Sequence, residues 1–325
     1  MRRKRLLWRA FRSRHSLETV QNNTREITAN DILLFSAVRN EAVRLPFFLD
    51  HYRAMGVQHF LFVDNGSDDG TRELLLGQKD VSLWSTNAGY KAARFGMDWV
   101  TWLLMRYGHG HWTITADADE LLVYPDHDTR LLPELTTWLE DQGMEAMGVM
   151  LLDLYPKGPL DSHFYQPGQN PCEVLQWFDA TGYWSERRGQ HNTVSILGGA
   201  RSRMFFGEAP HQSPVLSKVP LVKWRRSYAY FSSTHVVLPV QVNQCLDDPR
   251  SDRPDGVFLH TKMLPSVVSR AVEDKARGQG YTKVPLHDAY YEALAKAPDL
   301  WTTGSTPYQG WQQLVDLKLM FRGNW

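Results

Sequence analysis

Short apolar, β-prone runs alternate with segments of helical period between Ile32 and Asp153. The strands predicted from this pattern cover residues 32–38, 59–63, 81–84, 112–116 and 146–152. The helices predicted between them cover residues 45–55, 71–76, 91–107 and 132–142. Strands joined by helices pair in parallel through right-handed crossovers, which leaves helices on both faces of the sheet. The sequence therefore predicts an α/β, Rossmann-like fold with a mainly parallel sheet.

Acidic residues follow two of these strands at the point where each strand ends. Asp64 follows the apolar run 60–63, and Asp117, Asp119 and Glu120 follow the run 112–116. The carboxyl ends of parallel strands meet along one edge of a sheet, where open α/β folds bind ligands. Carboxylates gathered there repel one another unless a cation or several donors compensate them. A divalent metal bridging a diphosphate is such a cation, so the pattern predicts an enzyme acting on a nucleotide-activated substrate.

Asp117 and Asp119 flank a single small residue. In an extended segment, residues i and i+2 project to the same side, so both carboxylates can face one ligand. Hard oxygen ligands suit Mg²⁺ or Mn²⁺, which also hold the phosphate oxygens of a substrate. A solvated turn is the alternative interpretation. The preceding strand and the neighbouring Glu120 favour the metal site.

The loop over residues 64–71 has a structural and a functional interpretation. Its glycines permit a tight turn, and its later aspartates suit the cap of the next helix. Asp64 lies earlier, at the strand edge, where a carboxylate can meet ribose hydroxyls or a base N–H. Asn40 and Glu41 end the first strand in the same layer. They either line the same crevice or cap the helix that follows them.

Charge is unevenly distributed, although Lys plus Arg and Asp plus Glu both number 36. Seven of the basic residues and no acidic residue lie in the first 14 positions, which leaves 29 basic against 36 acidic residues elsewhere. The overall balance argues against a broad nucleic-acid-binding field. The basic cluster, interrupted by Leu6, Leu7, Trp8 and Phe11, is either a disordered, solvated tail or a segment attracted to anionic lipid headgroups.

No apolar run approaches the ~20 residues of a membrane span, and the N-terminus lacks the apolar core of a signal peptide. Cys172 and Cys245 have neither metal-ligand spacing nor the number needed for a disulfide framework. We therefore expect free thiols in a reducing compartment. The expected location is cytoplasmic, with peripheral association at the inner membrane face as a further possibility.

Four motifs occur in a fixed order in the first part of the chain. They are Ser36-Ala-Val-Arg-Asn-Glu41, Val63-Asp-Asn-Gly-Ser-Asp-Asp-Gly-Thr71, Asn87-Ala-Gly-Tyr-Lys-Ala-Ala-Arg94 and Asp117-Ala-Asp119. Over about residues 30–125 the chain thereby resembles the family 2-type glycosyltransferases with the GT-A fold. Leu45-Pro-Phe-Phe-Leu-Asp-His-Tyr52 is similar to the first helix of a bacterial branch of that superfamily.

This resemblance, together with the change in residue composition and periodicity along the chain, predicts three parts. Residues 1–28 form a basic N-terminal tail, and residues 265–325 a helical C-terminal extension. Residues 29–264 form the GT-A catalytic domain. Its nucleotide-binding half covers residues 29–125, and its acceptor half covers residues 126–264.

The resemblance also implies contacts with a nucleoside-diphosphate sugar of the UDP or GDP type. Asn40, Glu41 and Asp64 would contact the nucleoside. Lys91 and Arg94 would approach the diphosphate.

A metal ion, Mn²⁺ or Mg²⁺, would lie between Asp117, Asp119 and the donor. Many GT-A enzymes take a late His as a further metal ligand, and His260, which follows the apolar run 256–259, is the candidate. An ordinary hydrogen-bonded His at a strand end is the alternative.

The acceptor side resembles the family less closely. Gly198-Gly199-Ala200-Arg201-Ser202-Arg203 looks like an acceptor-side segment, in which Arg201 and Arg203 could grip phosphate. A β-turn with exposed arginines is the alternative. Inverting members carry an acidic pair that supplies the general base, and the chain lacks such a pair in the expected region. Glu208, which follows this segment, is the first candidate for the base, and Asp179 is the second.

The expected activity is metal-dependent transfer of a sugar to a hydroxyl of a saccharide or lipid-linked saccharide, with inversion by family analogy. Surface polysaccharide or glycolipid synthesis is the expected setting. A nucleotidyltransferase is one alternative, although residues 36–41 lack the glycine-rich phosphate loop typical of that class. A relative that lost catalysis and binds carbohydrate, or acts as a scaffold, is the other, and the missing acidic pair favours it.

Overall fold

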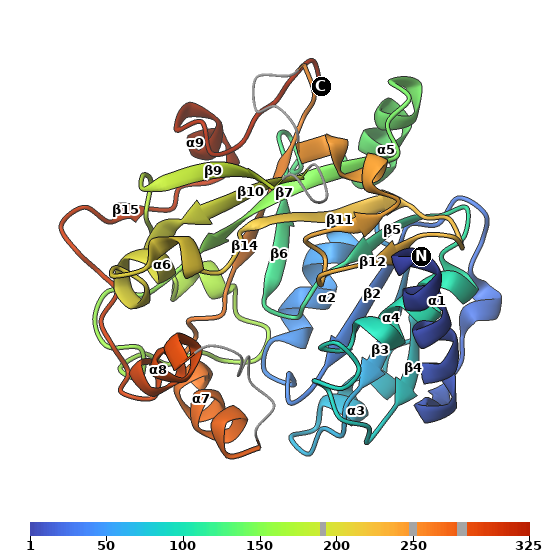
Figure 1. Cartoon of the computed structure of the whole chain (residues 1–325), viewed down its shortest axis with the longest axis horizontal. Coiled ribbons are helices and arrows are strands. Elements are labelled where there is room, and N and C mark those ends of the chain that lie inside the picture. The colour runs from blue at the N-terminus through green and yellow to red at the C-terminus, as the bar shows by residue number, and fades with distance from the viewer. Residues whose placement is uncertain (189–192, 247–251, 278–284) are drawn as a thin grey trace.

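A nine-stranded mixed sheet forms the centre of the computed structural model, which describes residues 1–188, 193–246, 252–277 and 285–325 (Figure 1). In sheet order the strands are β1 (Glu18–Gln21), β4 (Val81–Ser85), β3 (His59–Asp64), β2 (Leu33–Val38), β5 (Trp112–Thr115), β11 (Ser217–Lys223), β7 (Ala146–Asp153), β14 (Gly256–His260) and β6 (Glu120–Val123). Three of the nine, β1, β11 and β6, run against the other six. The predicted α/β fold with a mainly parallel sheet is confirmed.

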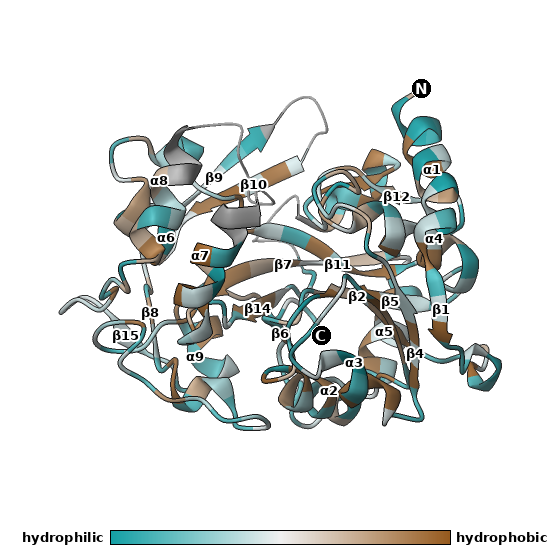
Figure 2. Ribbon diagram, turned by 90° about the horizontal axis from the view of Figure 1, so that it is seen from below, coloured by the Kyte–Doolittle hydropathy of each residue, from teal (hydrophilic) through white to brown (hydrophobic). Residues whose placement is uncertain are grey.

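Adjacent residues of the central strands belong to different cores. On β2, Leu33 and Phe35 pack with residues of α4 (Met97–Tyr107), whereas Leu34 packs with residues of α2 (Leu45–Ala54) and α5 (Leu132–Asp141). Neighbouring side chains of a strand point to opposite faces, so a continuous apolar run must be covered on both sides. Figure 2 shows these apolar strands, in brown, between the helices.

The helix predicted over residues 91–107 begins later, at Met97. Arg94, Phe95 and Gly96 precede it with φ angles of 54°, 58° and 77°. A Cβ on residue 96 would lie 2.9 Å from the Cβ of Ala37, so this left-handed position suits only glycine without a shift. The chain before α4 is therefore a tight turn packed on β2, and a helix cannot extend through it.

The prediction of a separate basic tail over residues 1–28 is wrong. Arg2–Ser13 form a helix, α1, that packs on α4 and buries Leu6 and Ala10. Arg9 forms an ion pair of 2.8 Å with the buried Asp98 of α4. After a short 3₁₀ turn the chain enters the sheet as β1, antiparallel to β4. The sequence pattern missed this arrangement because the partner of the basic helix lies about 90 residues away.

Smaller elements complete the fold around the sheet. The remaining helices are α3 (Thr71–Leu76), α6 (Gly199–Phe205), α7 (Ser266–Arg277), α8 (Pro285–Leu294) and α9 (Trp311–Asp316). The remaining strands are β8 (Trp177–Phe178), β9 (Tyr183–Arg188), β10 (Thr193–Gly198), β12 (Ala229–Tyr230), β13 (Val237–Leu238) and β15 (Thr306–Pro307). The predicted C-terminal extension contains the expected helices, but it also pairs with the acceptor half through β15 and β8.

None of the helices in the described part of the chain has the length and apolar character needed to cross a bilayer. Cys172 and Cys245 are both free, as expected.

Candidate functional site

A cavity of about 540 Å³ lies at the carboxyl ends of β2, β3 and β5. Residues 37–41, at the end of β2, and Asn65, after β3, line one wall. Residues 117–120 form the floor, and Arg201 of α6 and Tyr290 of α8 line the opposite wall. This is the sheet edge at which open α/β folds bind ligands. The predicted strand-end residues Asn40, Glu41, Asp117 and Asp119 all reach it.

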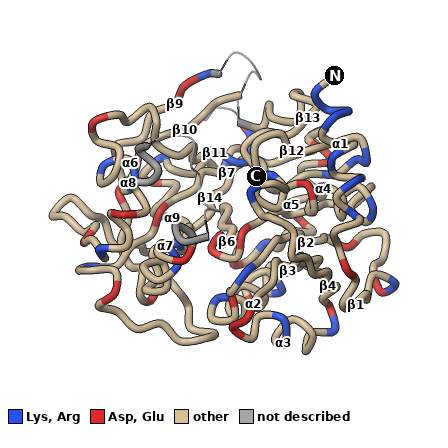
Figure 3. The backbone as a smooth tube through the Cα atoms, turned by 60° about the horizontal axis from the view of Figure 1, so that its bottom comes forward, with Lys and Arg blue, Asp and Glu red and all other residues tan. Residues whose placement is uncertain are grey.

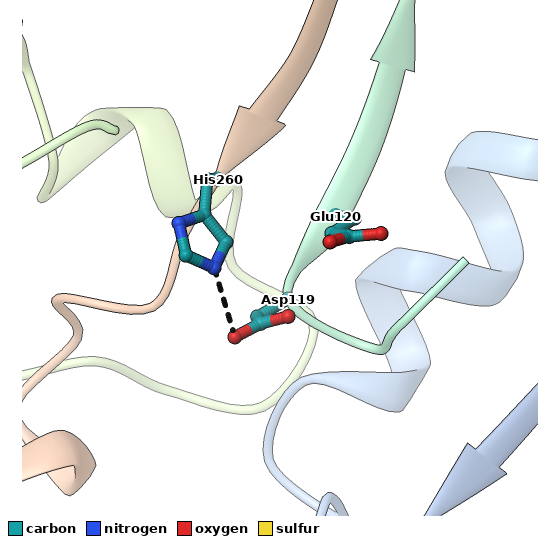
Figure 4. Close-up of side chains that lie close together, drawn as sticks. All are labelled: Asp119, Glu120 and His260. Atoms are coloured by element: carbon teal, nitrogen blue, oxygen red, sulfur yellow. Dashed lines mark ion pairs between the residues drawn. The ribbon is translucent and has the colours of Figure 1, made fainter. Parts of the chain in front are cut away.

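Strand register brings a histidine into the acidic floor. His260 of β14 lies opposite Glu120 on one neighbouring strand and opposite Asp153 on the other. Directly opposed residues share one face of a sheet, so the three side chains project together, and a slip of one residue would turn His260 away. One ligand atom from each of Asp119, Glu120 and His260 lies within 4.8 Å of the others (Figure 4).

The two ring nitrogens of His260 face different carboxylates. Nδ1 lies 2.6 Å from Oδ1 of Asp153, and Nε2 lies 3.4 Å from Oδ2 of Asp119. When Nδ1–H donates to Asp153, the lone pair of Nε2 faces the Asp119 carboxylate. Two electron-pair donors that face each other require a cation between them, either a proton or a metal ion.

The pKa values of this group follow from burial and from its neighbours. Burial lowers the pKa of His260, but Asp119 and Asp153 outweigh this effect and raise it above its usual value. Burial acts to raise the pKa of Asp119, yet His260 holds it well below its usual range. The pKa of Asp117 is raised, first by desolvation and then by the charge of Asp119, although 51% of its side chain is open to the cavity. The charge of Asp119 is therefore well compensated by His260, whereas Asp117 is the less compensated carboxylate of the floor.

Lys218 of β11 partly neutralises the floor, and no sequence pattern indicated this position. Its ammonium contacts the buried Glu120 and lies 3.7 Å from Asp117. Burial raises the pKa of Glu120 to about 7, against the opposing effect of Lys218. Burial would lower the pKa of Lys218, but Glu120 and Asp117 raise it, so the lysine stays charged. Glu120 is consequently engaged by a lysine, whereas Asp117 and Asp119 are the more open carboxylates.

Hydrogen-bond donors without partners lie on the opposite wall. Arg201 donates from Nε to Oδ2 of Asp153 at 2.7 Å, while its buried Nη2 has no hydrogen-bond partner in the described part of the chain. The same holds for the hydroxyls of Ser213 and Tyr290, which also line the cavity. Lys262 completes this wall, with its ammonium 5.8 Å from the centre of the Tyr290 ring. Buried donors left unpaired cost free energy, so the wall is suited to an anionic ligand.

The cavity wall that contains Asn40 and Glu41 is bridged by α7. The guanidinium of Arg270 donates to the Glu41 carboxylate and to the backbone oxygen of Asn40. Arg44 holds the other Glu41 oxygen at 3.1 Å. Asn40 thus keeps the loop in place, with its Oδ1 accepting from the backbone N–H of Asp68 at 3.0 Å. Both predicted residues line the cavity and also organise the loops around it.

Three residues expected at the nucleotide do not line the cavity. Asp64 is fully buried in its own turn, where it accepts from the Ser67 N–H at 3.0 Å and pairs with Arg72 at 3.0 Å. Arg94 pairs with Asp98 and donates to the backbone oxygens of residues 230 and 231. Lys91 lies in the turn before α4, outside the cavity wall. Instead of Asp64, the next residue, Asn65, reaches the cavity.

The two arginines of the acceptor-side segment diverge. The segment is a helix, not an extended strand or turn, so residues two apart point to different sides. Arg201 faces the main cavity, whereas Arg203 lines a second cavity of about 360 Å³. There Arg203 pairs with Asp179 at 2.8 Å, and the Tyr155 hydroxyl donates to the same carboxylate.

Neither candidate for the general base lies in the main cavity. Asp179 is committed to Arg203 in the second cavity, and Glu208 is an exposed residue of the turn after α6. The base assignments made from chain order are therefore not supported by position. Order along the chain suggested them, but Asp179 lines the second cavity and Glu208 lies in an exposed turn after α6.

Asp153, which contacts His260 and Arg201, is a residue that the same strand-end rule could have found, because it closes β7 as Asp64 closes β3. Lys218 carries no such signal. It lies inside an antiparallel strand whose insertion between β5 and β7 is visible only in the fold.

Comparisons with known proteins add little to this picture. No protein-family model matches the chain, and no curated protein sequence matches it. One similar solved structure is described as the crystal structure of 4-diphosphocytidyl-2C-methyl-D-erythritol synthase. It is 12% identical, the match covers 61% of this chain and 76% of that chain, and the TM-score is 0.28. A likeness this weak carries no argument about function.

Proposed function

We propose that the chain is a metal-dependent glycosyltransferase that moves a sugar from a nucleoside-diphosphate donor to an acceptor hydroxyl. The observation that carries the proposal is the composition of one cavity. Facing acceptors on Asp119 and His260 lie across from unpartnered buried donors on Arg201, Ser213 and Tyr290. Such an arrangement suits a divalent cation bound together with a polyanion.

The residues of the floor fit a divalent metal. Asp119 and His260 would be its protein ligands; Glu120 lies within 4.8 Å of both but contacts Lys218, and Asp117 lines the same cavity. A set of carboxylate oxygen and imidazole nitrogen suits Mn²⁺ better than Mg²⁺, which prefers oxygen alone. Asp153 would fix the ring of His260 from behind, as carboxylates behind metal-binding histidines do. When bound, the metal would supply positive charge at the leaving diphosphate.

The remaining residues account for binding and charge. Arg201 and Lys262 would neutralise diphosphate oxygens, and the Tyr290 hydroxyl would donate a further hydrogen bond. Asn65 and Asn40 would meet the nucleoside at the ends of β3 and β2. Positive groups held here before the reaction stabilise the negative charge that grows on the departing diphosphate. The acceptor would be a saccharide or a lipid-linked saccharide.

A donor screen tests this proposal. The full chain is incubated with UDP- and GDP-sugars and with nucleoside triphosphates, each with Mn²⁺ or with chelator. Release of nucleoside diphosphate that requires Mn²⁺ supports sugar transfer. Release of pyrophosphate from a triphosphate identifies a nucleotidyltransferase instead.

Thermal unfolding gives a readout that needs no substrate turnover. A ligand present at 100 times its Kd stabilises the native state by about 2.7 kcal/mol. We expect Mn²⁺ with a nucleoside diphosphate to raise the Tm of the wild type and to leave that of Asp119→Ala unchanged. Binding without any turnover would point to the carbohydrate-binding or scaffold alternative. If neither Mn²⁺ nor a nucleoside diphosphate changes the Tm of the wild type, the proposal is contradicted.

A further inference from the structure

The outward face of α1 carries a continuous basic stripe. Lys4, Trp8 and Arg12 recur at intervals of four residues, and Arg5 lies beside them; all four side chains are exposed. The opposite side of the helix, with Leu6 and Ala10, is buried against the domain. Figure 3 shows the basic residues, in blue, gathered along this helix. The charges are therefore displayed on a fixed surface, since the helix beneath them is docked.

Trp8 is exposed to 59% at the centre of this stripe. Its ring stacks on Phe11 with centroids 5.7 Å apart, and Phe11 meets the edge of Trp102 on α4 at the same distance. An aromatic stack thus supports the indole from below and holds it outward. Indole rings exposed in this way are characteristic of membrane–water interfaces, where one part of the ring is apolar and another is wet.

The charges of the stripe are not used within the domain. Lys4, Arg5 and Arg12 form no ion pair with any residue that the structure describes, whereas Arg9, on the flank of the helix, pairs with Asp98. Beyond residue 14 the chain carries 29 basic and 36 acidic residues, so the strong positive cluster at the N-terminus contrasts with an acidic remainder. A positive face on an otherwise acidic molecule orients that molecule toward an anionic surface.

We infer that the exposed face of α1 binds the surface of a bilayer containing anionic phospholipid. The apolar side of α1 is already packed on α4, so binding would combine phosphate contacts of the basic side chains with insertion of the single indole. A few charges with a tryptophan at their centre suit a lipid surface better than a nucleic acid, whose binding rests on many phosphate contacts.

The position of α1 relates this face to the main cavity. Leu6 packs with Ala229 of β12 and Leu238 of β13. The segment that joins these two strands contains Ser232 and Ser233, which line the cavity. A bilayer on α1 would therefore lie beside one wall of the candidate site. Vesicle binding itself does not depend on the proposed sugar transfer, so the two proposals can fail separately.

Vesicle sedimentation tests the inference with the full-length protein. The vesicles contain phosphatidylcholine with or without phosphatidylglycerol, at low and at physiological salt. We expect binding only when phosphatidylglycerol is present, and weaker binding at higher salt. Each basic residue near an anionic surface multiplies the partition coefficient by about five. The triple variant Lys4→Gln, Arg5→Gln, Arg12→Gln should therefore bind about a hundredfold more weakly.

Two further variants separate this face from general charge. The triple variant Lys79→Gln, Lys296→Gln, Lys318→Gln changes the net charge equally at exposed sites in other elements, and it should bind within about twofold of the wild type. Trp8→Ala should weaken vesicle binding several-fold and leave the Tm unchanged, because the ring is exposed. Equal losses in both triple variants would overturn the inference. The inference would also be overturned if the wild-type protein did not bind vesicles with phosphatidylglycerol at low salt. The same conclusion would follow if Trp8→Ala left vesicle binding unchanged and short duplex DNA displaced the protein from the vesicles.

Discussion

Two groups of carboxylates on either side of α6 show how differently the same chemistry can be used. In the second cavity Asp179 accepts two hydrogen bonds from Arg203 and one from the Tyr155 hydroxyl. In the main cavity Asp119 lies 3.4 Å from His260, and Asp117 lies 3.7 Å from Lys218. The first group is complete without a ligand. In the second group, carboxylate oxygens still have lone pairs that accept no hydrogen bond from the residues that the structure describes, as expected of a site that binds a cation.

The comparison predicts opposite consequences for matched substitutions. A carboxylate whose partners are all protein groups contributes to stability, and its removal strands those partners. A carboxylate held close to others of the same sign contributes little to stability or opposes folding, so its removal affects ligand binding instead. The following experiments proceed from the largest expected effect to the smallest.

Asp119→Ala should reduce Mn²⁺-dependent nucleoside-diphosphate release by about a thousandfold, because the charge opposite His260 is lost. Its Tm should fall modestly, because His260 holds the pKa of Asp119 well below its usual range and the charged carboxylate therefore contributes stability. Asp179→Ala, measured at a temperature where it is folded, should retain turnover within a few-fold. Full activity in Asp119→Ala, or activity insensitive to chelator, would contradict the assignment of the floor as a metal site.

Arg201→Gln and Arg203→Gln test whether α6 divides the two regions. Calorimetry with Mn²⁺ and a nucleoside diphosphate should show about thirtyfold weaker binding for Arg201→Gln, which corresponds to one lost charge-assisted hydrogen bond. Arg203→Gln should bind within about threefold of the wild type. Arg201→Lys, which keeps the charge beside Asp153, provides a control for misfolding. Equal losses at both positions would mean that the second cavity also contacts the nucleotide.

Asp179→Ala should lower the free energy of unfolding by about 2 kcal/mol, since it leaves Tyr155 and Arg203 without their acceptor. Denaturant titration of the metal-free protein measures this directly. In the same titration Asp117→Ala, which removes the carboxylate whose pKa is raised, should differ from the wild type by no more than about 0.5 kcal/mol. A loss at Asp117 as large as that at Asp179 would abolish the distinction between the open and the closed group.

The pH dependence of stability tests how strongly Asp153 is paired in the folded protein. Burial opposes its ionisation, but Arg201 and His260 lower its pKa from 3.8 to about 2. A depressed carboxyl pKa contributes stability above the unfolded value, and that stability is lost as the pH falls through the folded value. Between about pH 4 and pH 2 the stability of the wild type should therefore fall about 1 kcal/mol further than that of Asp153→Asn. Parallel curves would show that the ion pair is weak.

The sequence determined the local elements and one edge of the site. Hydrophobic periodicity located the central strands and α2, α3 and α5, because the periods of strand and helix depend only on neighbouring residues. The same local logic brought Asn40, Glu41, Asp117 and Asp119 to the cavity, since strand ends of a parallel sheet meet at one edge. It failed for Asp64, whose turn supplies its own donors.

Only the tertiary structure decided which charges meet. His260 reaches the floor because β14 lies between β6 and β7 in a register that no local pattern encodes. Lys218 and Arg201 come from segments about 50 to 100 residues away from the carboxylates they contact. The docking of α1 likewise depends on Asp98, far along the chain from Arg9. Electrostatic energy depends on distance in space, whereas sequence patterns report distance along the chain, so the partners of a charge are known only once the sheet has formed.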